Sequence, residues 1–225
     1  LRRGIKRNNN NFLNLIAFFL TRDDREIYTA NNLINLIINN LTLKEFKNLN
    51  NGDLFLKFNT LGKQSSFQNY LEYLISREEK KYEYFYELLT KPNPYLFKKG
   101  ATLILLEYDP KTEKIAILCP HFCNYELNPN PEVPLFMAFK IKDESIFEPI
   151  VYCRDKNYCV KNLNNILEKK DIKNIKLFDS QKSVYIHIIR RFARCTKPEF
   201  NSVYNKHFAL LNNYKIFEKK SIISV

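Results

Sequence analysis

Four of the chain's five cysteines lie in its central part and offer the most direct route to a chemistry. Cys119 and Cys123 flank His121 in the stretch KIAILCPHFCNYE, and Cys153 and Cys159 follow further along. Zinc takes about four such ligands in a tetrahedron. These four cysteines could therefore bind one zinc ion, provided that the two pairs meet at one edge of a sheet.

The spacing of the cysteines argues against zinc as the first interpretation. Three and five residues separate the members of the two pairs, and no Cys-x-x-Cys occurs. Structural zinc sites usually place about two to four residues between paired ligands, and cysteine is often simply buried. We therefore expect no cofactor. We expect Cys119 to close an apolar strand and His121 to be an exposed turn residue.

A second set of side chains fits a metal-dependent nuclease. Such enzymes hold Mg²⁺ with carboxylates and orient water with a lysine. Glu107 and Asp109 end one predicted strand, and Lys140 lies on another. Ala138 stands where an acidic residue would precede the lysine. The preceding helix offers Glu83 or Glu87, but any helix here offers a glutamate. These residues thus allow two interpretations. They form the metal site of a divergent restriction-enzyme-like nuclease that uses Mg²⁺, or the two acids simply border a turn while the lysines face solvent.

Other enzyme classes find less support in the sequence. A reactive cysteine needs a nearby base, but nothing ties His187 or His207 to a cysteine, and His187 in YIHII fits a core histidine. The four glycines are scattered, which excludes a glycine-rich phosphate loop of the Walker or Rossmann kind. We therefore expect a non-enzymatic protein without a small-molecule ligand.

The chain is strongly basic, with a formal net charge of +12 and a pI near 9.4. Such a charge indicates nucleic acid or another polyanion as a partner, although an AT-rich genome would also raise the lysine content. Arginine is the better signal and the better ligand for phosphate. We predict nucleic-acid contacts at the two arginine clusters, which comprise Arg2, Arg3, Arg190, Arg191 and Arg194.

The spacing of apolar residues predicts a helical region over residues 1–98. In NFLNLIAFFL the large apolar residues recur at the spacing of one helix face, and NNLINLIINNL and SFQNYLEYLI repeat the pattern. Thr42 with Glu45 three residues later predicts a capping box at a further helix. An Asn-Gly-Asp sequence predicts a turn after it.

Residues 99–153 carry a different pattern, which predicts an antiparallel sheet. The strand-like runs are GATLILLEYD, KIAILC, PLFMAFKIKDE and IFEPIVYC, joined by Pro, Asn and Asp turns without helical segments. This order is typical of an antiparallel β-meander. Residues 154–225 predict a mixed α/β region that packs on the sheet. The fold class is therefore α+β, in one composite domain, and no apolar run is long enough to span a membrane.

Several stretches in this order resemble large, poorly characterised proteins of nucleocytoplasmic large DNA viruses, mainly over residues 1–153. They are LRRGIKRNNNNFLNLIAFFL, NGDLFLKF, FQNYLEYL, GATLILLEYDPKTEKIAILCP and IFEPIVY, with Asn11 where the family has Ser. The resemblance brings no catalytic residues. It implies a protein of the host cytoplasm or the virion, with nucleic acid or viral structural proteins as partners. A purely structural capsid or scaffold protein is a further alternative, and the start at Leu1 suggests a fragment of a longer chain.

Overall fold

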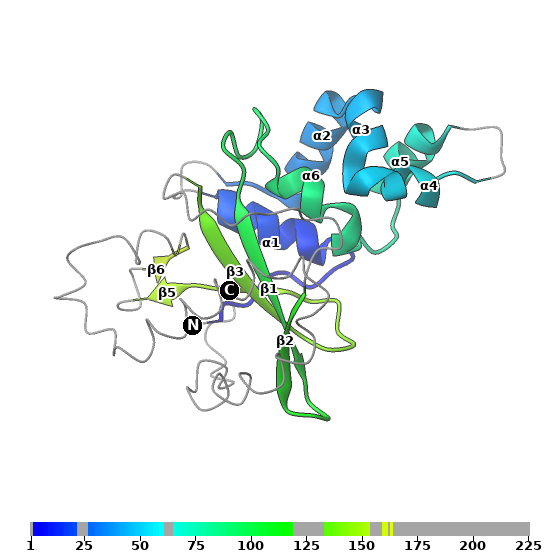
Figure 1. Cartoon of the computed structure of the whole chain (residues 1–225). Helices are drawn as coiled ribbons and strands as arrows, with labels where there is room; N and C mark the ends of the chain where they lie inside the picture. Colours follow the sequence, from blue (N-terminus) through cyan, green and yellow to red (C-terminus); the bar gives the residue numbers. More distant parts are fainter. Residues whose placement is uncertain are drawn as a thin grey trace. The chain divides into compact units, whose positions relative to one another are not determined.

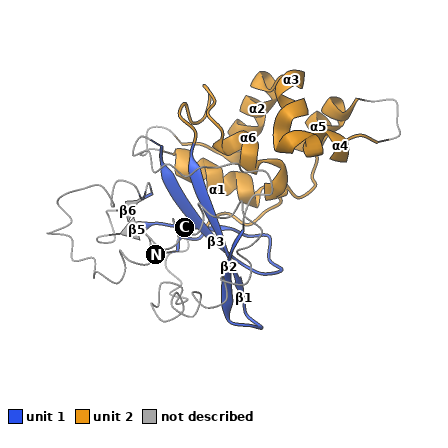
Figure 2. Cartoon of the chain, viewed as in Figure 1, with its two compact units in different colours: residues 1–4, 101–225 blue, residues 5–100 orange. Residues whose placement is uncertain are grey.

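The computed structural model describes residues 2–21, 27–60, 65–118, 133–153, 159–161 and 163. The chain divides into two compact units, coloured separately in Figure 2. We call residues 5–100 the helical unit, and residues 1–4 with 101–225 the sheet unit. Within the described ranges, no helix has the length and apolar character needed to cross a bilayer.

The helical unit is built from short helices (Figure 1), as the apolar periodicity predicts. They are α1 (Asn11–Leu20), α2 (Ala30–Asn40), α3 (Leu43–Asn48), α4 (Asp53–Lys57), α5 (Ser66–Ile75) and α6 (Tyr86–Thr90), with the 3-10 helices η1 (Leu49–Gly52) and η2 (Tyr82–Tyr84). The expected inward face of α1 is buried at Phe12, Leu15, Ile16 and Phe19. The helix predictions are confirmed for these segments.

Capping boxes fix where two of these helices begin. The capping box predicted at α3 is confirmed, because the Glu45 backbone N–H donates to Thr42 Oγ1 at 3.2 Å and the Thr42 N–H donates to Glu45 Oε2 at 2.9 Å. Thr29 and Asn32 form a second box at the start of α2. Each such cap stabilises a helix by about 1 kcal/mol.

Aromatic side chains fill the centre of the helical unit. Tyr70 and Phe46 are fully buried and stack with their ring centroids 5.0 Å apart. Phe58 packs edge-on against Tyr70 at 5.1 Å, and the Tyr70 hydroxyl donates to the Tyr84 carbonyl at 3.3 Å. Because offset and edge-on aromatic pairs add about 0.5–1.5 kcal/mol beyond their buried area, this cluster holds α3, α5 and the segment before α6 together.

The sheet unit contains a mixed sheet with strand order β2-β1-β3-β4, of which β1, β2 and β3 are labelled in Figure 1. β1 (Thr102–Asp109) pairs antiparallel with β2 (Lys114–Leu118), which confirms the predicted hairpin at DPKTEK. β1 also pairs in parallel with β3 (Leu135–Ile141), and β3 pairs antiparallel with β4 (Glu148–Ile150). The predicted antiparallel meander is therefore wrong, whereas the α+β class is confirmed.

The place of β1 in the sheet explains this correction. β1 lies between β2 and β3, and its residues 103–106 are all buried. A strand covered on both faces has a continuous apolar sequence, whereas a strand with one face exposed to solvent alternates apolar and polar residues. A meander would place β2 between β1 and β3. Instead, the long connection 119–134 follows β2, and β3 pairs with β1 on its other side.

The N-terminal residues pair with the outer edge of β4. Arg2 forms an antiparallel bridge with Ile150, and the Arg3 backbone N–H donates to the Pro149 carbonyl at 3.0 Å. Pro149 has no N–H to donate and therefore suits an edge strand. A separate antiparallel pair follows, formed by β5 (Tyr152–Cys153) and β6 (Cys159–Val160).

Candidate functional site

The carboxyl ends of the parallel strands β1 and β3 bring together the residues considered for a nuclease. Glu107 is the register partner of Lys140, and Lys140 Nζ lies 2.7 Å from Glu107 Oε2. Two residues further along the chain in each case, Nζ of Lys142, which directly follows β3, lies 2.8 Å from Oδ2 of Asp109, the last residue of β1. Because alternate residues of a strand share a face, both ion pairs lie on one face of the sheet.

The two ion pairs differ in exposure and in electrostatics. The Glu107 and Lys140 side chains are mostly covered, with 19% and 15% exposed, and Lys140 Nζ lies 5.7 Å from the Phe147 ring centroid. In the outer pair the Lys142 side chain is more open, with 47% exposed, whereas the Asp109 side chain is as covered as that of Glu107. The hydrogen bond from Lys142 holds the pKa of the Asp109 carboxyl below its ordinary value, and the same bond raises the pKa of Lys142. Both outer residues are therefore charged at neutral pH.

Each carboxylate of this set is matched by an ammonium group. A Mg²⁺ ion needs carboxylate oxygens that are available to it, so metal binding here would first have to displace a lysine. Among the residues whose placement is given, no three His, Cys, Asp or Glu side chains come together as a metal-binding group. Glu107 and Lys140 thus form one ion pair, and Asp109 forms a second with Lys142.

The Arg2 side chain makes its contacts within the sheet unit. Its guanidinium lies 4.7 Å from the Phe139 ring centroid, and Nη1 lies 3.4 Å from Glu148 Oε2, with only 13% of the Arg2 side chain exposed. These contacts fasten the N-terminal residues to β3 and β4. The nearby Arg3 is exposed and is held at its backbone by Pro149.

Most of the remaining predicted site residues lie outside the described part of the chain. Cys153 and Cys159 are register partners in the β5–β6 pair. The two members of this predicted cysteine pair therefore lie opposite each other on neighbouring strands. The predicted residues without a described position are Cys119, Cys123, Arg190, Arg191 and Arg194, together with His121, His187 and His207.

A basic surface in the helical unit joins the end of the basic stretch LRRGIKR, which the sequence indicated, to a loop that it did not indicate. We call residues 5–10 the strap and residues 76–81 the basic loop. Asn9 joins them, because its Nδ2 donates to the Arg77 carbonyl at 2.5 Å and its carbonyl accepts from the Lys80 backbone N–H at 2.7 Å. Two segments far apart in the sequence are therefore fixed side by side.

Four exposed cations lie on these two segments. Lys6 and Arg7 belong to the strap, and Arg77 and Lys81 belong to the basic loop. None of the four forms an ion pair within the described ranges. We call them the strap surface. All four side chains are exposed to solvent, and Glu78 and Glu79 of the basic loop form no ion pair with them within the described residues.

A buried lysine stabilises the conformation of the basic loop. Lys80 is buried, and its Nζ donates to the Ser76 and Glu78 carbonyls at 2.8 and 2.9 Å while lying 4.6 Å from the Tyr73 ring centroid. Burial lowers the pKa of Lys80. Tyr73 adds further bonds, since its hydroxyl donates to the Glu79 carbonyl at 2.6 Å and accepts from the Lys81 N–H at 2.9 Å.

The asparagine tract fixes the strap against α1. Asn14 Nδ2 donates to the Lys6 carbonyl at 3.1 Å and to Asn8 Oδ1 at 2.9 Å. Asn8 Oδ1 also accepts from the Asn10 N–H at 2.9 Å, and the Asn8 N–H donates to Asn11 Oδ1 at 2.8 Å. Asparagine suits this task because it hydrogen-bonds nearby backbone in turns. The tract therefore has a structural role here.

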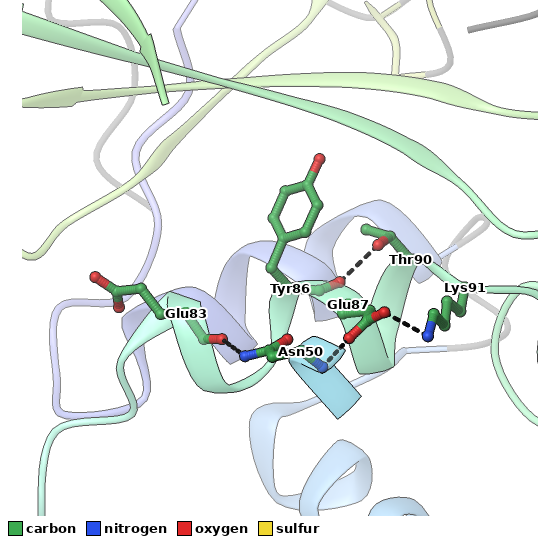
Figure 3. Close-up of polar contacts among 6 residues, drawn as sticks. All are labelled: Asn50, Glu83, Tyr86, Glu87, Thr90 and Lys91. Atoms are coloured by element: carbon green, nitrogen blue, oxygen red, sulfur yellow. Dashed lines mark hydrogen bonds and ion pairs between the residues drawn. The ribbon is translucent and has the colours of Figure 1, made fainter. Parts of the chain in front are cut away.

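Glu87 is the buried acid of the helical unit, and its surroundings are structural (Figure 3). Its Oε2 accepts from the Asn50 backbone N–H and its Oε1 pairs with Lys91, while Asn50 Nδ2 donates to the Glu83 carbonyl at 2.9 Å. Asn50 is buried and has a φ of 54°, in the left-handed region where asparagine is tolerated. Glu87 thus fixes the turn between α3 and α4.

No protein-family model, curated protein or solved structure matches this chain. The resemblance to viral proteins therefore stays a prediction.

Proposed function

We propose that this protein is a non-enzymatic module that binds nucleic acid through the strap surface. The observation that carries the proposal is that Asn9 donates one hydrogen bond to the basic loop and accepts another from it. These bonds join the strap, which carries Lys6 and Arg7, to the loop that carries Arg77 and Lys81. A surface assembled from sequence-distant cations differs from a single run of lysines. It presents charge in a fixed arrangement that a phosphate backbone can match.

The charge balance around this surface favours an anion as the partner. The acidic residues Glu78 and Glu79 are exposed in the basic loop and reduce its charge, but the strap carries no acid. Elsewhere in the helical unit, Lys57 Nζ lies 5.3 Å from the ring centroid of Tyr84, and Lys57 has no acidic partner within the described ranges. The formal charge of +12 over the whole chain adds long-range attraction.

Nucleic acid is preferred over a neighbouring virion protein because the strap surface is polar and cationic. Protein–protein interfaces are depleted of lysine at their cores and enriched in apolar anchors. Phosphate contacts use lysine and arginine at the surface and release bound counter-ions. The proposal therefore predicts binding that depends strongly on salt and weakly on sequence.

The test is a titration of a fluorescently labelled DNA duplex with the full chain over a series of NaCl concentrations. We expect the logarithm of the association constant to fall linearly with the logarithm of the salt concentration. No binding at low salt would reject the proposal and would leave the structural capsid or scaffold protein as the better account.

A nuclease is the second candidate, and the placement of its residues at the carboxyl ends of two parallel strands favours it, although Mg²⁺ would first have to displace Lys140 from Glu107. These residues and Asp109 share one face at the ends of parallel strands. The candidate predicts cleavage of DNA with Mg²⁺ or Mn²⁺ that is lost on Asp109→Ala. Binding without cleavage under any metal would remove it and would leave the binding module.

A further inference from the structure

We infer that Cys153 and Cys159 form a reversible intrachain disulfide. The observation is their register in the antiparallel pair of β5 and β6, where each is the other's direct partner. This inference does not rest on nucleic-acid binding. The two cysteines belong to the sheet unit, whereas the strap surface belongs to the helical unit.

The backbone geometry of such a pair suits a disulfide. Directly opposed residues of antiparallel strands have α-carbons about 4.5–5.5 Å apart, whichever of the two kinds of pair they form. Disulfides span α-carbon separations of about 4.4–6.8 Å, with most near the middle of that range. Cys153 and Cys159 therefore need no movement of the strands to reach a bonding separation.

A disulfide fits these residues better than a zinc site does. A structural zinc site needs about four protein ligands, and the register supplies two. A disulfide needs only those two.

The reaction needs an oxidant, which we take to be a small disulfide such as glutathione disulfide. The thiolate of one cysteine attacks this disulfide, forms a mixed disulfide and releases one glutathione. The thiolate of the other cysteine then attacks the protein-side sulfur, forms the Cys153–Cys159 bond and releases the second glutathione. The two cysteines lose two electrons, glutathione disulfide gains them, and the two protons leave on the glutathione thiols.

The test uses the reduced, folded full chain in glutathione buffers of increasing oxidised fraction. Remaining thiols are alkylated, and the chain is digested with trypsin without reductant. Cleavage after Lys142, Arg154, Lys156 and Lys161 places the two cysteines on separate peptides, residues 143–154 and 157–161. We expect these two peptides to appear linked in the oxidised monomer and to separate after reduction.

Three variants sharpen the result. Cys153→Ser and Cys159→Ser should each abolish the linked peptide, whereas Cys195→Ser, which also removes one thiol, should leave it unchanged. The inference is overturned if oxidation gives only glutathione adducts on Cys153 and Cys159. It is equally overturned if their bonds go to Cys119, Cys123 or a second chain.

Discussion

Lys140 and Glu107 lie side by side on the parallel strands β1 and β3, with Nζ and Oε2 2.7 Å apart and both side chains largely covered. Glu107→Gln should lower the free energy of unfolding by about 1–2 kcal/mol, because a partly buried ammonium loses its charged partner. Urea denaturation followed by circular dichroism measures this change.

Glu144→Gln is the matched control for that substitution. Its side chain is exposed, and its contact with Lys140 is made by the backbone carbonyl at 3.4 Å, which the change retains. The expected loss is within about 0.5 kcal/mol. Equal losses in the two variants would contradict a specific role of the Glu107 carboxylate.

The outer ion pair predicts an acid dependence. The pKa of Asp109 is held below its ordinary 3.8, first by the hydrogen bond from Lys142. The stabilising contribution of the pair is therefore present above about pH 3.8 and is lost as the pH falls through the lower pKa of the folded state. Lys142→Met should raise the Asp109 pKa toward 3.8, as followed by carboxyl NMR titration.

Lys111→Met provides the comparison for this titration. It removes the same charge but keeps the backbone N–H of residue 111, which donates to Asp109 Oδ1 at 2.9 Å. The Asp109 pKa should then change much less than in Lys142→Met. If both variants shift it equally, the cause is general charge and not the bond from Lys142.

The buried carboxylate of Glu87 predicts a large loss of stability on truncation. Glu87→Ala leaves the buried Asn50 N–H without its acceptor and should cost about 2–3 kcal/mol. Glu83→Ala is the control, because Glu83 accepts from Asn50 through its carbonyl. A Glu87 variant as stable as the Glu83 variant would show that the Asn50 turn does not depend on this carboxylate.

Burial of Tyr70 predicts an alkaline limit to stability. Burial raises its pKa above the ordinary 10.0, and the neighbouring Tyr73 adds to the shift. The folded state thus keeps the Tyr70 proton when the unfolded chain loses it, so this contribution is complete below pH 10.0 and declines as the pH rises further. Tyr70→Phe should flatten the fall of the melting temperature above pH 10. An unchanged slope would mean that other groups control it.

The sequence predicted those elements whose signals are local. The apolar spacing along α1 and the capping box of Thr42 and Glu45 lie within single helices, and both are confirmed. The run LILL in β1 already indicated a strand covered on both faces. Taken together with the long connection before β3, it would have argued against a meander.

The features missed in the sequence depend on distant partners. Glu87 looks like any helical glutamate until the Asn50 turn, far away in the chain, is seen to donate to it. Arg77 and Lys81 look like a solvated charge run with Glu78 and Glu79, because nothing local connects them to the strap through Asn9. Such pairings are set by tertiary packing, which no periodicity or spacing reveals.

The most direct test of nucleic-acid binding compares variants that each remove two positive charges. Lys6→Gln with Arg7→Gln alters the strap, Arg77→Gln with Lys81→Gln alters the basic loop, and Lys111→Gln with Lys114→Gln alters the exposed hairpin between β1 and β2. We predict that each strap-surface variant weakens DNA binding and reduces the salt slope by about one for each cation that contacts phosphate. We predict that the hairpin variant binds like the unaltered chain. Equal loss of affinity in all three variants would contradict a defined binding surface and would leave only the general charge of the chain.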